Sequence, residues 1–347
     1  MTYKSTKKKL SALLGVSAIA LSTLAAEPTF GGWMYTWSQA TLSESNDTFS
    51  EGQYSYAEAG FNLTDKIDNA TLFFQDYIVY DGTSDISNSI DYFSMQYDFS
   101  EDEFGNGSSL RVGKYLLDMG ANGDYNAGDV LTYEATEDED ERWLLSYSAP
   151  VVSNESGALI LTPFTTLPIA TDVDPDSVEG YGLISKYAFA DSSISSVEAV
   201  AYYNADDNST KVAGAIKGDL GMNFGIAGNI DVTNTNDWDA SFYASKIVDK
   251  TEIDLQFAYM NEYYDSTTYA GAYLKFCPTL SYLVSDNITI DLENVTKYAF
   301  EEDEMSNTLN LSAECYLNDS FYITPGIETG FDSDEIVAIT FEAYQEF

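Results

Sequence analysis

Apolar and polar residues alternate along most of this chain, in runs bounded by turn-forming residues. In the final run one face carries Val337, Ile339, Phe341, Ala343, Gln345 and Phe347, and the other carries Ala338, Thr340, Glu342, Tyr344 and Glu346. The same alternation recurs over residues 222–231, 253–260 and 321–328. A period of two residues places successive side chains on opposite faces of a β-strand. The pattern predicts an all-β protein whose strands each have one apolar and one polar face.

The connectors between the predicted strands fall into two interleaved sets. The short set comprises residues 64–68, 99–108, 150–157, 191–193, 217–221, 248–251, 285–287 and 318–319. The other set, mostly longer and more acidic, comprises residues 43–51, 81–88, 119–141, 168–178, 205–209, 233–236, 264–267, 300–305 and 330–334. Short turns at one end and longer loops at the other are typical of transmembrane β-barrels. The connectors therefore predict a transmembrane antiparallel β-barrel of about 18 strands, with 16 as the alternative.

The N-terminal residues have the three parts of a secretory signal peptide. The basic part consists of Lys4, Lys7, Lys8 and Lys9. An apolar stretch from Leu10 to about Leu24 follows, and it ends at the small residues Ala25 and Ala26. The alternative, an uncleaved anchor, is less favoured because the stretch is shorter than the ~20 residues of a membrane-spanning helix. We expect residues 1–26 to be removed on export and residues 27–347 to form a single barrel domain.

Charge limits what the chain can bind. The whole sequence has a formal net charge of −42, and removal of the four signal-peptide lysines leaves about −46. Such a chain lacks the basic surface that nucleic acids require. Its field attracts cations and repels anions. The same composition also suits a surface adapted to salty surroundings, where charges are screened over about 8 Å.

The final strand resembles the closing strand of bacterial outer-membrane β-barrels of the porin-like family. In that family a C-terminal aromatic residue belongs to the signal that the insertion machinery reads. The resemblance implies this role for Phe341, Ala343 and Phe347. Gln345 departs from the family pattern, because an aromatic residue is usual at its position.

Residues 111–131 read RVGKYLLDMGANGDYNAGDVL and are similar to a porin-like motif. In that motif a strand with Gly-Arg or Gly-Lys is followed by aromatic-Gly-x-Gly-Asp and Asn-Pro-x-Asp; here Met119 replaces the aromatic residue and Gly128 the proline. A long early loop often narrows the pore in porins. The resemblance therefore implies a constriction in which Asp118, Asp124, Asp129, Glu134 and the acidic run to Asp140 face Arg111, with Lys114 or Arg142 as further cations. The alternative is an outward, solvated loop, which the run Glu137–Glu141 favours.

Candidate metal-binding and catalytic groups are few. Asp124, Asn126 and Gly128 fall at spacings used by calcium loops, with Asp129 beside them, but the glycine at the sixth position and the distant bidentate Glu are missing. Calcium at Asp124, Asn126 and Asp129 stays a hypothesis, and no other cofactor is expected. The chain has no His, which removes the Ser-His, Cys-His and His-metal arrangements. We do not expect an enzyme.

The two cysteines are not expected to form a disulfide. Alternation places Cys315 on an apolar face and Cys277 on the opposite, polar face of its strand. A disulfide requires Cα atoms about 6 Å apart and side chains that point toward each other. Both thiols are therefore predicted to be free.

Aromatic residues near the strand ends are candidates for the girdles found where barrels cross the membrane interface. They are Trp33, Tyr35, Trp37, Trp238, Phe242 and Tyr259. Aromatic residues are also good strand formers, so ordinary strand composition is the alternative explanation.

The sequence and the resemblance together predict an outer-membrane porin of a Gram-negative bacterium. It would be a passive diffusion channel for small hydrophilic solutes, with a preference for cations. Its expected partners are outer-membrane lipid, lipopolysaccharide and the barrel-insertion machinery, and a homotrimer is common among channel barrels of this size. The alternatives are a non-conducting barrel or β-rich surface protein for adhesion or envelope structure, and a soluble exported β-sandwich.

Overall fold

Alternating segments form β-strands throughout the computed structural model of the protein. The structure describes residues 29–43, 53–80, 86–100, 107–115, 142–167, 180–205, 208–233, 238–260, 272–300, 303–330 and 335–347. The strands are β1 (Thr29–Ser43), β2 (Gln53–Ile67), β3 (Ala70–Tyr80), β4 (Ile86–Asp98), β5 (Ser109–Tyr115), β6 (Arg142–Asn154), β7 (Gly157–Thr166), β8 (Gly180–Phe189), β9 (Ile194–Asn204), β10 (Ser209–Asp219), β11 (Asn223–Asp231), β12 (Trp238–Val248), β13 (Thr251–Met260), β14 (Tyr273–Ser285), β15 (Ile288–Ala299), β16 (Glu304–Asn318), β17 (Phe321–Gly330) and β18 (Glu335–Glu346).

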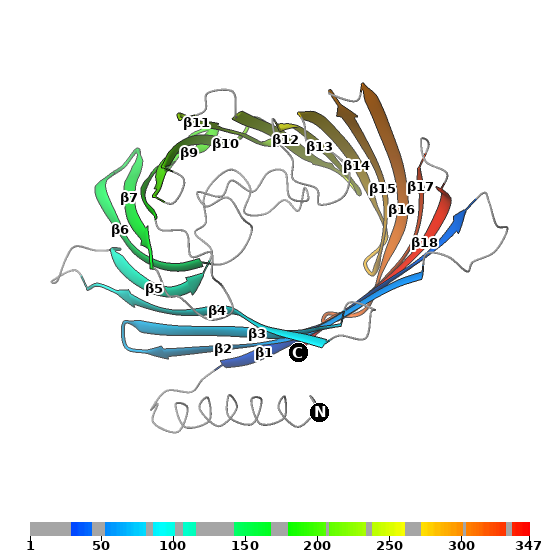
Figure 1. Ribbon diagram of the computed structural model, residues 1–347, viewed down its shortest axis with the longest axis horizontal. Coiled ribbons are helices and arrows are strands. Elements are labelled where there is room, and N and C mark those ends of the chain that lie inside the picture. Colours follow the sequence, from blue (N-terminus) through cyan, green and yellow to red (C-terminus); the bar gives the residue numbers. More distant parts are fainter. Residues whose placement is uncertain are drawn as a thin grey trace.

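Each strand pairs with its neighbours in sequence, and β1 also pairs with β18, so the sheet closes on itself. Figure 1 shows the strands following one another around a ring. The β1–β18 pairing is antiparallel and joins Trp33 to Glu346 at one end and Ser43 to Glu335 at the other. Closure leaves no unpaired edge along the strands. The predicted all-β antiparallel barrel of 18 strands is confirmed, and the alternative of 16 strands is wrong.

Tight turns join the strands at one end of the barrel. The connection between β2 and β3 consists of residues 68 and 69, and that between β12 and β13 of residues 249 and 250. Asp68 has φ 50° and Asp249 has φ 56°. Asp tolerates this left-handed conformation better than most residues, because its short side chain bonds the local backbone. The connector predicted at residues 248–251 contains its turn, whereas the one predicted at residues 64–68 is placed too early, because β2 continues to Ile67.

The predicted connector at residues 150–157 also differs from the structure in its extent. Residues 150–157 were expected to be a short connector, but β6 continues to Asn154, which pairs with Gly157 of β7. The register of this pair shifts between Pro150 and Val152. A bulge suits proline, which has no N–H to donate to a ladder. The strand therefore passes through the proline rather than stopping at it.

The two faces of the barrel wall differ in exposure. Phe257 of β13 lies opposite Phe276 of β14, and these side chains are 42% and 44% exposed. The adjacent residues Ala258 and Cys277 point to the other face and are 3% exposed. Side chains on the concave face of a closed sheet crowd together, so the exposed apolar face is the outer one and the buried face lines the interior. Large apolar residues are thus turned outward, as on a lipid-facing barrel.

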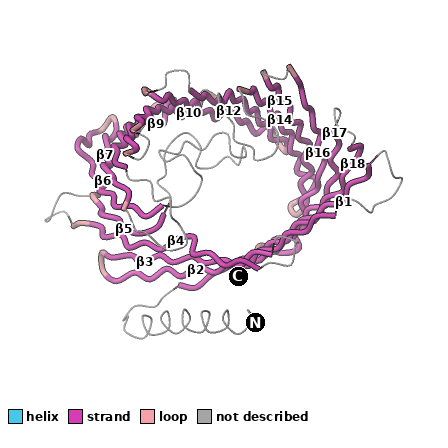
Figure 2. The backbone as a smooth tube through the Cα atoms, viewed as in Figure 1, coloured by secondary structure: helices cyan, strands magenta, loops and turns pink. Residues whose placement is uncertain are grey.

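The cysteines follow the predicted faces. Cys277 is buried on the inner face, whereas Cys315 pairs with Ile288 and Ile323 on the outer face, and both thiols are free. Apart from turns and short extended segments, the described backbone is all strand (Figure 2). Among these residues no helix is long and apolar enough to cross a bilayer.

The candidate girdle residues separate into two groups. Trp238 and Tyr259 lie on the outer face, with stacked rings whose centroids are 4.2 Å apart. Trp33, Tyr35 and Trp37 lie on the inner face, because they alternate with Met34, which is 52% exposed. The girdle interpretation is therefore wrong for the three residues of β1, which line the interior instead.

Candidate functional site

The inner face of the barrel wall is the candidate site, and Arg111 of β5 lies on it. Its guanidinium donates from Nε and Nη2 to Ser94 Oγ at 3.1 and 3.0 Å. The same group lies 4.1 Å above the ring of Tyr115, whose hydroxyl donates to Ser146 Oγ at 2.7 Å. Hydrogen bonds and a cation–π contact together hold the Arg111 charge in a fixed place against the wall.

Lys114 lies on the opposite face. It pairs with Phe93 on one side and Trp143 on the other, and Phe93 is 43% exposed on the outer face. A lysine three residues from Arg111 must point the other way, because three is an odd number of steps along a strand. Lys114 therefore does not belong to the inner wall. Of the predicted constriction, Asp118, Asp124, Asp129, Glu134 and the run to Asp140 lie outside the described residues, as does Asn126.

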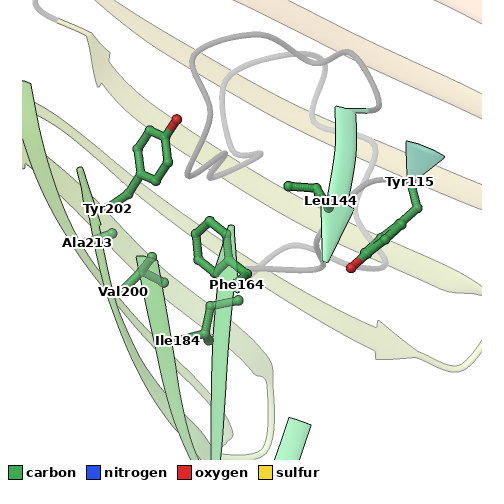
Figure 3. Packing of buried hydrophobic residues seen from close by; sticks show 7 residues of the cluster. All are labelled: Tyr115, Leu144, Phe164, Ile184, Val200, Tyr202 and Ala213. Carbon is green, nitrogen blue, oxygen red and sulfur yellow. The ribbon is translucent and has the colours of Figure 1, made fainter. Parts of the chain in front are cut away.

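A buried apolar cluster occupies the inner face from β5 to β10. Its members are Tyr115, Leu144, Phe164, Ile184, Val200, Tyr202 and Ala213 (Figure 3). Phe164 of β7 and Tyr202 of β9 stack with centroids 5.9 Å apart and an interplanar angle of 12°. Gly182 of β8 lies between them in register, and a Cβ there would overlap the Phe164 ring. The glycine therefore allows two rings from non-adjacent strands to meet across β8.

Charged groups on this part of the wall include cations. Lys186 of β8 forms an ion pair with Glu198 of β9 at 3.7 Å. Lys211 and Lys217 lie on the same face of β10, because they share the parity of Ala213. With Arg111, they place positive charge beside the apolar cluster. Sequence reasoning missed this cluster, although the pair of glycines at alternate positions, Gly180 and Gly182, was a signal for close packing over β8.

The wall from β16 through β17, β18 and β1 to β2 has a different character. Four tyrosines from consecutive strands stand directly opposite one another in register: Tyr316, Tyr322, Tyr344 and Tyr35. The rings of Tyr316 and Tyr322 are 5.5 Å apart, and those of Tyr322 and Tyr344 are 5.3 Å apart. The Tyr35 ring makes an edge contact of 5.9 Å with Tyr56 of β2. The tyrosines thus form a continuous row around the inner wall.

Carboxylates lie beside this row and accept hydrogen bonds from its hydroxyl groups. The Tyr316 hydroxyl donates to Glu314 at 2.9 Å, and the Tyr322 hydroxyl donates to Glu342 at 3.3 Å. The Tyr56 hydroxyl donates to Glu58 at 2.7 Å. We call these residues, with Trp33, the tyrosine–carboxylate belt; its members are Trp33, Tyr35, Tyr56, Glu58, Glu314, Tyr316, Tyr322, Glu342 and Tyr344.

The indole ring of Trp33 lies over Gly60 of the neighbouring strand β2. Its indole Nε1 donates to Glu58, and a Cβ on Gly60 would overlap the indole ring. Gly60 pairs with Trp33 in register, so the ring lies flat over the neighbouring strand. Glu58 thereby accepts hydrogen bonds from both Trp33 and Tyr56. Charge-assisted bonds of this kind are stronger than neutral ones and fix the carboxylate.

The belt has no basic residue on its own strands except at one end. Residues 29–43 and 304–346, which form β1, β16, β17 and β18, contain neither Lys nor Arg, and Lys66 is the single cation of β2. The ion pair between Lys186 and Glu198 lies on β8 and β9, outside this wall. Among the described residues, no group of three or more His, Cys, Asp or Glu is arranged to hold a metal ion. Negative charge therefore predominates along this wall.

Solved structures of outer-membrane proteins resemble the whole barrel. Wzi of Escherichia coli, described as a carbohydrate-binding β-barrel involved in group 1 capsule assembly, superposes with a TM-score of 0.60 at 10% identity, covering 96% of this chain and 87% of its own. A BenF-like porin from Pseudomonas fluorescens gives 0.58 at 8% identity, with coverages of 93% and 98%. OprD of Pseudomonas aeruginosa gives 0.56 at 10% identity, with coverages of 93% and 96%.

Sequence comparisons add nothing to this likeness, since no protein-family model and no curated protein matches the chain. The likeness is therefore one of fold alone. The chain has the fold of a porin-like outer-membrane β-barrel.

Proposed function

We propose that this protein is a passive diffusion channel of the bacterial outer membrane that passes small hydrophilic solutes and prefers cations. The observation that carries the proposal is the contrast between the two faces of the wall. Apolar side chains are turned outward, whereas the inner face of β16 to β2 carries half-exposed tyrosines and carboxylates with Lys66 as its single cation. A polar interior that is rich in carboxylates lowers the barrier for cations.

The unequal distribution of charge on the inner face also supports this preference. The cations Arg111, Lys186, Lys211 and Lys217 lie on the strands that carry the buried cluster around Phe164 and Tyr202. The strands β16, β17 and β18 carry carboxylates, and neither they nor β1 contain a Lys or Arg. A solute beside those strands would meet mainly negative charge.

Planar-bilayer recording of the purified full chain tests the proposal. We expect discrete conductance steps. In a KCl gradient, the reversal potential should have the sign that indicates a higher permeability for K⁺ than for Cl⁻. The triple variant Glu58→Gln, Glu314→Gln and Glu342→Gln should move the reversal potential toward zero. The shift should be larger at 0.1 M than at 1 M salt, because the Debye length falls from about 10 Å to about 3 Å. Anion preference of the natural chain would contradict the proposal.

Arg111 and Lys114 provide a matched pair of controls. Arg111→Gln removes a positive charge from the inner wall, and Lys114→Gln removes the same charge from the outer face. The first should increase cation preference and the second should leave it unchanged. An equal effect of both would mean that bulk charge, rather than the inner wall, sets the preference.

The same proposal implies a location in the outer membrane and a set of partners. Outer-membrane lipid and lipopolysaccharide would cover the apolar outer face, and the insertion machinery would read the final strand, in which Phe341 is 44% and Phe347 66% exposed. Residues 1–26 would direct export and be cleaved, and a homotrimer is the expected assembly. Retention of the processed chain in the outer-membrane fraction, extractable only with detergent, checks the location.

A non-conducting barrel is the second candidate. Its support is the likeness to Wzi, which is described as a carbohydrate-binding β-barrel. A protein of that kind would give no conductance steps and would not let small sugars swell liposomes. The same recordings therefore separate the two functions.

A further inference from the structure

The tyrosine–carboxylate belt combines two features that both favour a positively charged organic ligand. Aromatic rings carry negative charge on their faces and attract cations within about 6 Å of the ring centroid. Glu58, Glu314 and Glu342 add full negative charges beside those rings. We propose that the belt is a binding site for weakly hydrated organic cations, such as quaternary ammonium ions, on their way through the barrel; this rests on the proposed channel function.

The geometry of the row supports a site rather than scattered aromatic residues. Tyr316, Tyr322 and Tyr344 lie on consecutive strands, and Tyr35 joins them only through barrel closure, since β1 and β18 are at opposite ends of the described chain. Successive contacts of 5.5, 5.3 and 5.9 Å run from Tyr316 to Tyr56, and the Tyr35–Tyr344 register pair connects them. Because the row runs around the wall from strand to strand, a cation crossing the barrel beside any of these strands would pass close to at least one ring.

Hydrogen bonding prepares the belt for a cation and not for an anion. The hydroxyls of Tyr56, Tyr316 and Tyr322 donate to carboxylates, so these donors are turned away from a passing anion. Each donation also holds its ring in place, which lowers the entropy lost when a ligand binds. The belt side chains that the structure describes are half-buried or exposed, so their rings are open to contact.

The charge balance points to the ligand's sign. The strands β1, β16, β17 and β18 contain no Lys or Arg, so no cation on those strands neutralises Glu342 or Glu314. A small inorganic ion such as K⁺ keeps its water and interacts weakly with rings. A quaternary ammonium ion has little hydration to lose and gains from both the rings and the carboxylates. The belt should therefore distinguish organic from inorganic cations.

Block of K⁺ current by tetramethylammonium tests the inference, with tert-butanol as the neutral probe of similar shape. We expect tetramethylammonium to reduce the current of the natural channel in a saturable way and tert-butanol to have no such effect. The double variant Tyr35→Leu, Tyr344→Leu should raise the half-blocking concentration about tenfold. Glu58→Gln with Glu342→Gln should raise it as well.

Two further variants separate binding from folding. Tyr35→Phe with Tyr344→Phe keeps both rings and should change the half-blocking concentration by less than about twofold, because the ring face carries the attraction. Tyr298→Leu removes a tyrosine from the outer face, where it pairs with Leu274 and Met305, and should leave the block unchanged. Gel mobility with and without boiling verifies that each variant is a folded barrel.

The outcomes distinguish this inference from the proposed function. Suppose that the channel prefers cations but that tetramethylammonium blocks it no better than tert-butanol does. This result would overturn the inference, and the proposed channel function would still hold. Equal loss of block in the Phe and Leu variants would also overturn it. A protein with no conductance, or with anion preference, would overturn the proposed function itself.

Discussion

The inner wall of the barrel holds aromatic residues in two contrasting settings. Between β5 and β10, Phe164 and Tyr202 are 4% and 2% exposed and pack against aliphatic side chains. Between β16 and β2, Tyr35 and Tyr322 are half-exposed and stand beside carboxylates. The first region stabilises the wall through apolar burial, and the second presents chemistry to the interior. One closed sheet thus has a tightly packed region and a half-exposed, acidic region on its inner face.

Both regions use the same device to place a ring. Gly182 makes room for the Phe164–Tyr202 stack, and Gly60 makes room for Trp33. In each case the ring lies over a neighbouring strand whose residue has no side chain. The difference lies in the ring's partner, which is another ring over Gly182 and the Glu58 carboxylate over Gly60. Glycine therefore sets the position of the aromatic residue, and its neighbours set its role.

The largest expected effect is on Phe164. Phe164→Ala removes a buried ring and should lower the free energy of unfolding by about 3–5 kcal/mol. Tyr35→Ala, on the half-exposed wall, should cost about 1 kcal/mol. Denaturant unfolding in lipid vesicles measures both values. Equal losses would show that the two walls do not differ in their contribution to stability.

A smaller loss of the free energy of unfolding is expected when a side chain is added at Gly182 of β8. Gly182→Ala forces the Phe164 ring to move and should cost roughly 1–3 kcal/mol. Gly214→Ala is the matched control, because a Cβ there has its nearest contact at 3.6 Å; it should stay within about 0.5 kcal/mol of the natural chain. The same unfolding experiment compares them, and a tolerated Gly182→Ala would contradict the packing role of the glycine.

The ion pair beside the apolar cluster should contribute less. Glu198 is 4% exposed and Lys186 is 38% exposed, with 3.7 Å between the charged atoms. Removal of one partner of a fully buried pair costs roughly 3–5 kcal/mol, but solvent screens Lys186, so Lys186→Met should cost about 1–2 kcal/mol. Lys217→Met, on the next strand but one, serves as the control with little expected loss. If Lys186→Met left the free energy of unfolding unchanged, solvent alone would be enough to stabilise the charge of Glu198.

The smallest expected effect is on the belt itself. Tyr316→Phe removes the hydroxyl that donates to Glu314, at a side chain that is 38% exposed. Water replaces the lost bond there, so the free energy of unfolding should fall by about 0.5 kcal/mol or less. A loss above roughly 1.5 kcal/mol would show that the belt supports the fold as strongly as a buried hydrogen bond, against the contrast between the two walls.

Local patterns were enough to locate the strands and the connectors. The alternation around Phe257 and the positions of Asp68 and Asp249 at turns depend only on neighbours in sequence. The predicted strand limits were wrong where a tertiary feature sets them. At Pro150, for example, the bulge depends on pairing with β7. The site was predicted less well. Arg111 was placed on the inner wall, but Lys114 was assigned there against its own parity.

The sequence by itself indicated about eighteen amphipathic strands, their order and the split of Cys277 and Cys315 between faces, since a period of two residues and the turn residues are local properties. Only the tertiary structure decided which wall is packed and which is open. Tyr322 and Tyr344 meet Tyr35 because β18 pairs with β1, across almost the whole length of the chain. No sequence period encodes such a contact, because it arises from closure of the sheet.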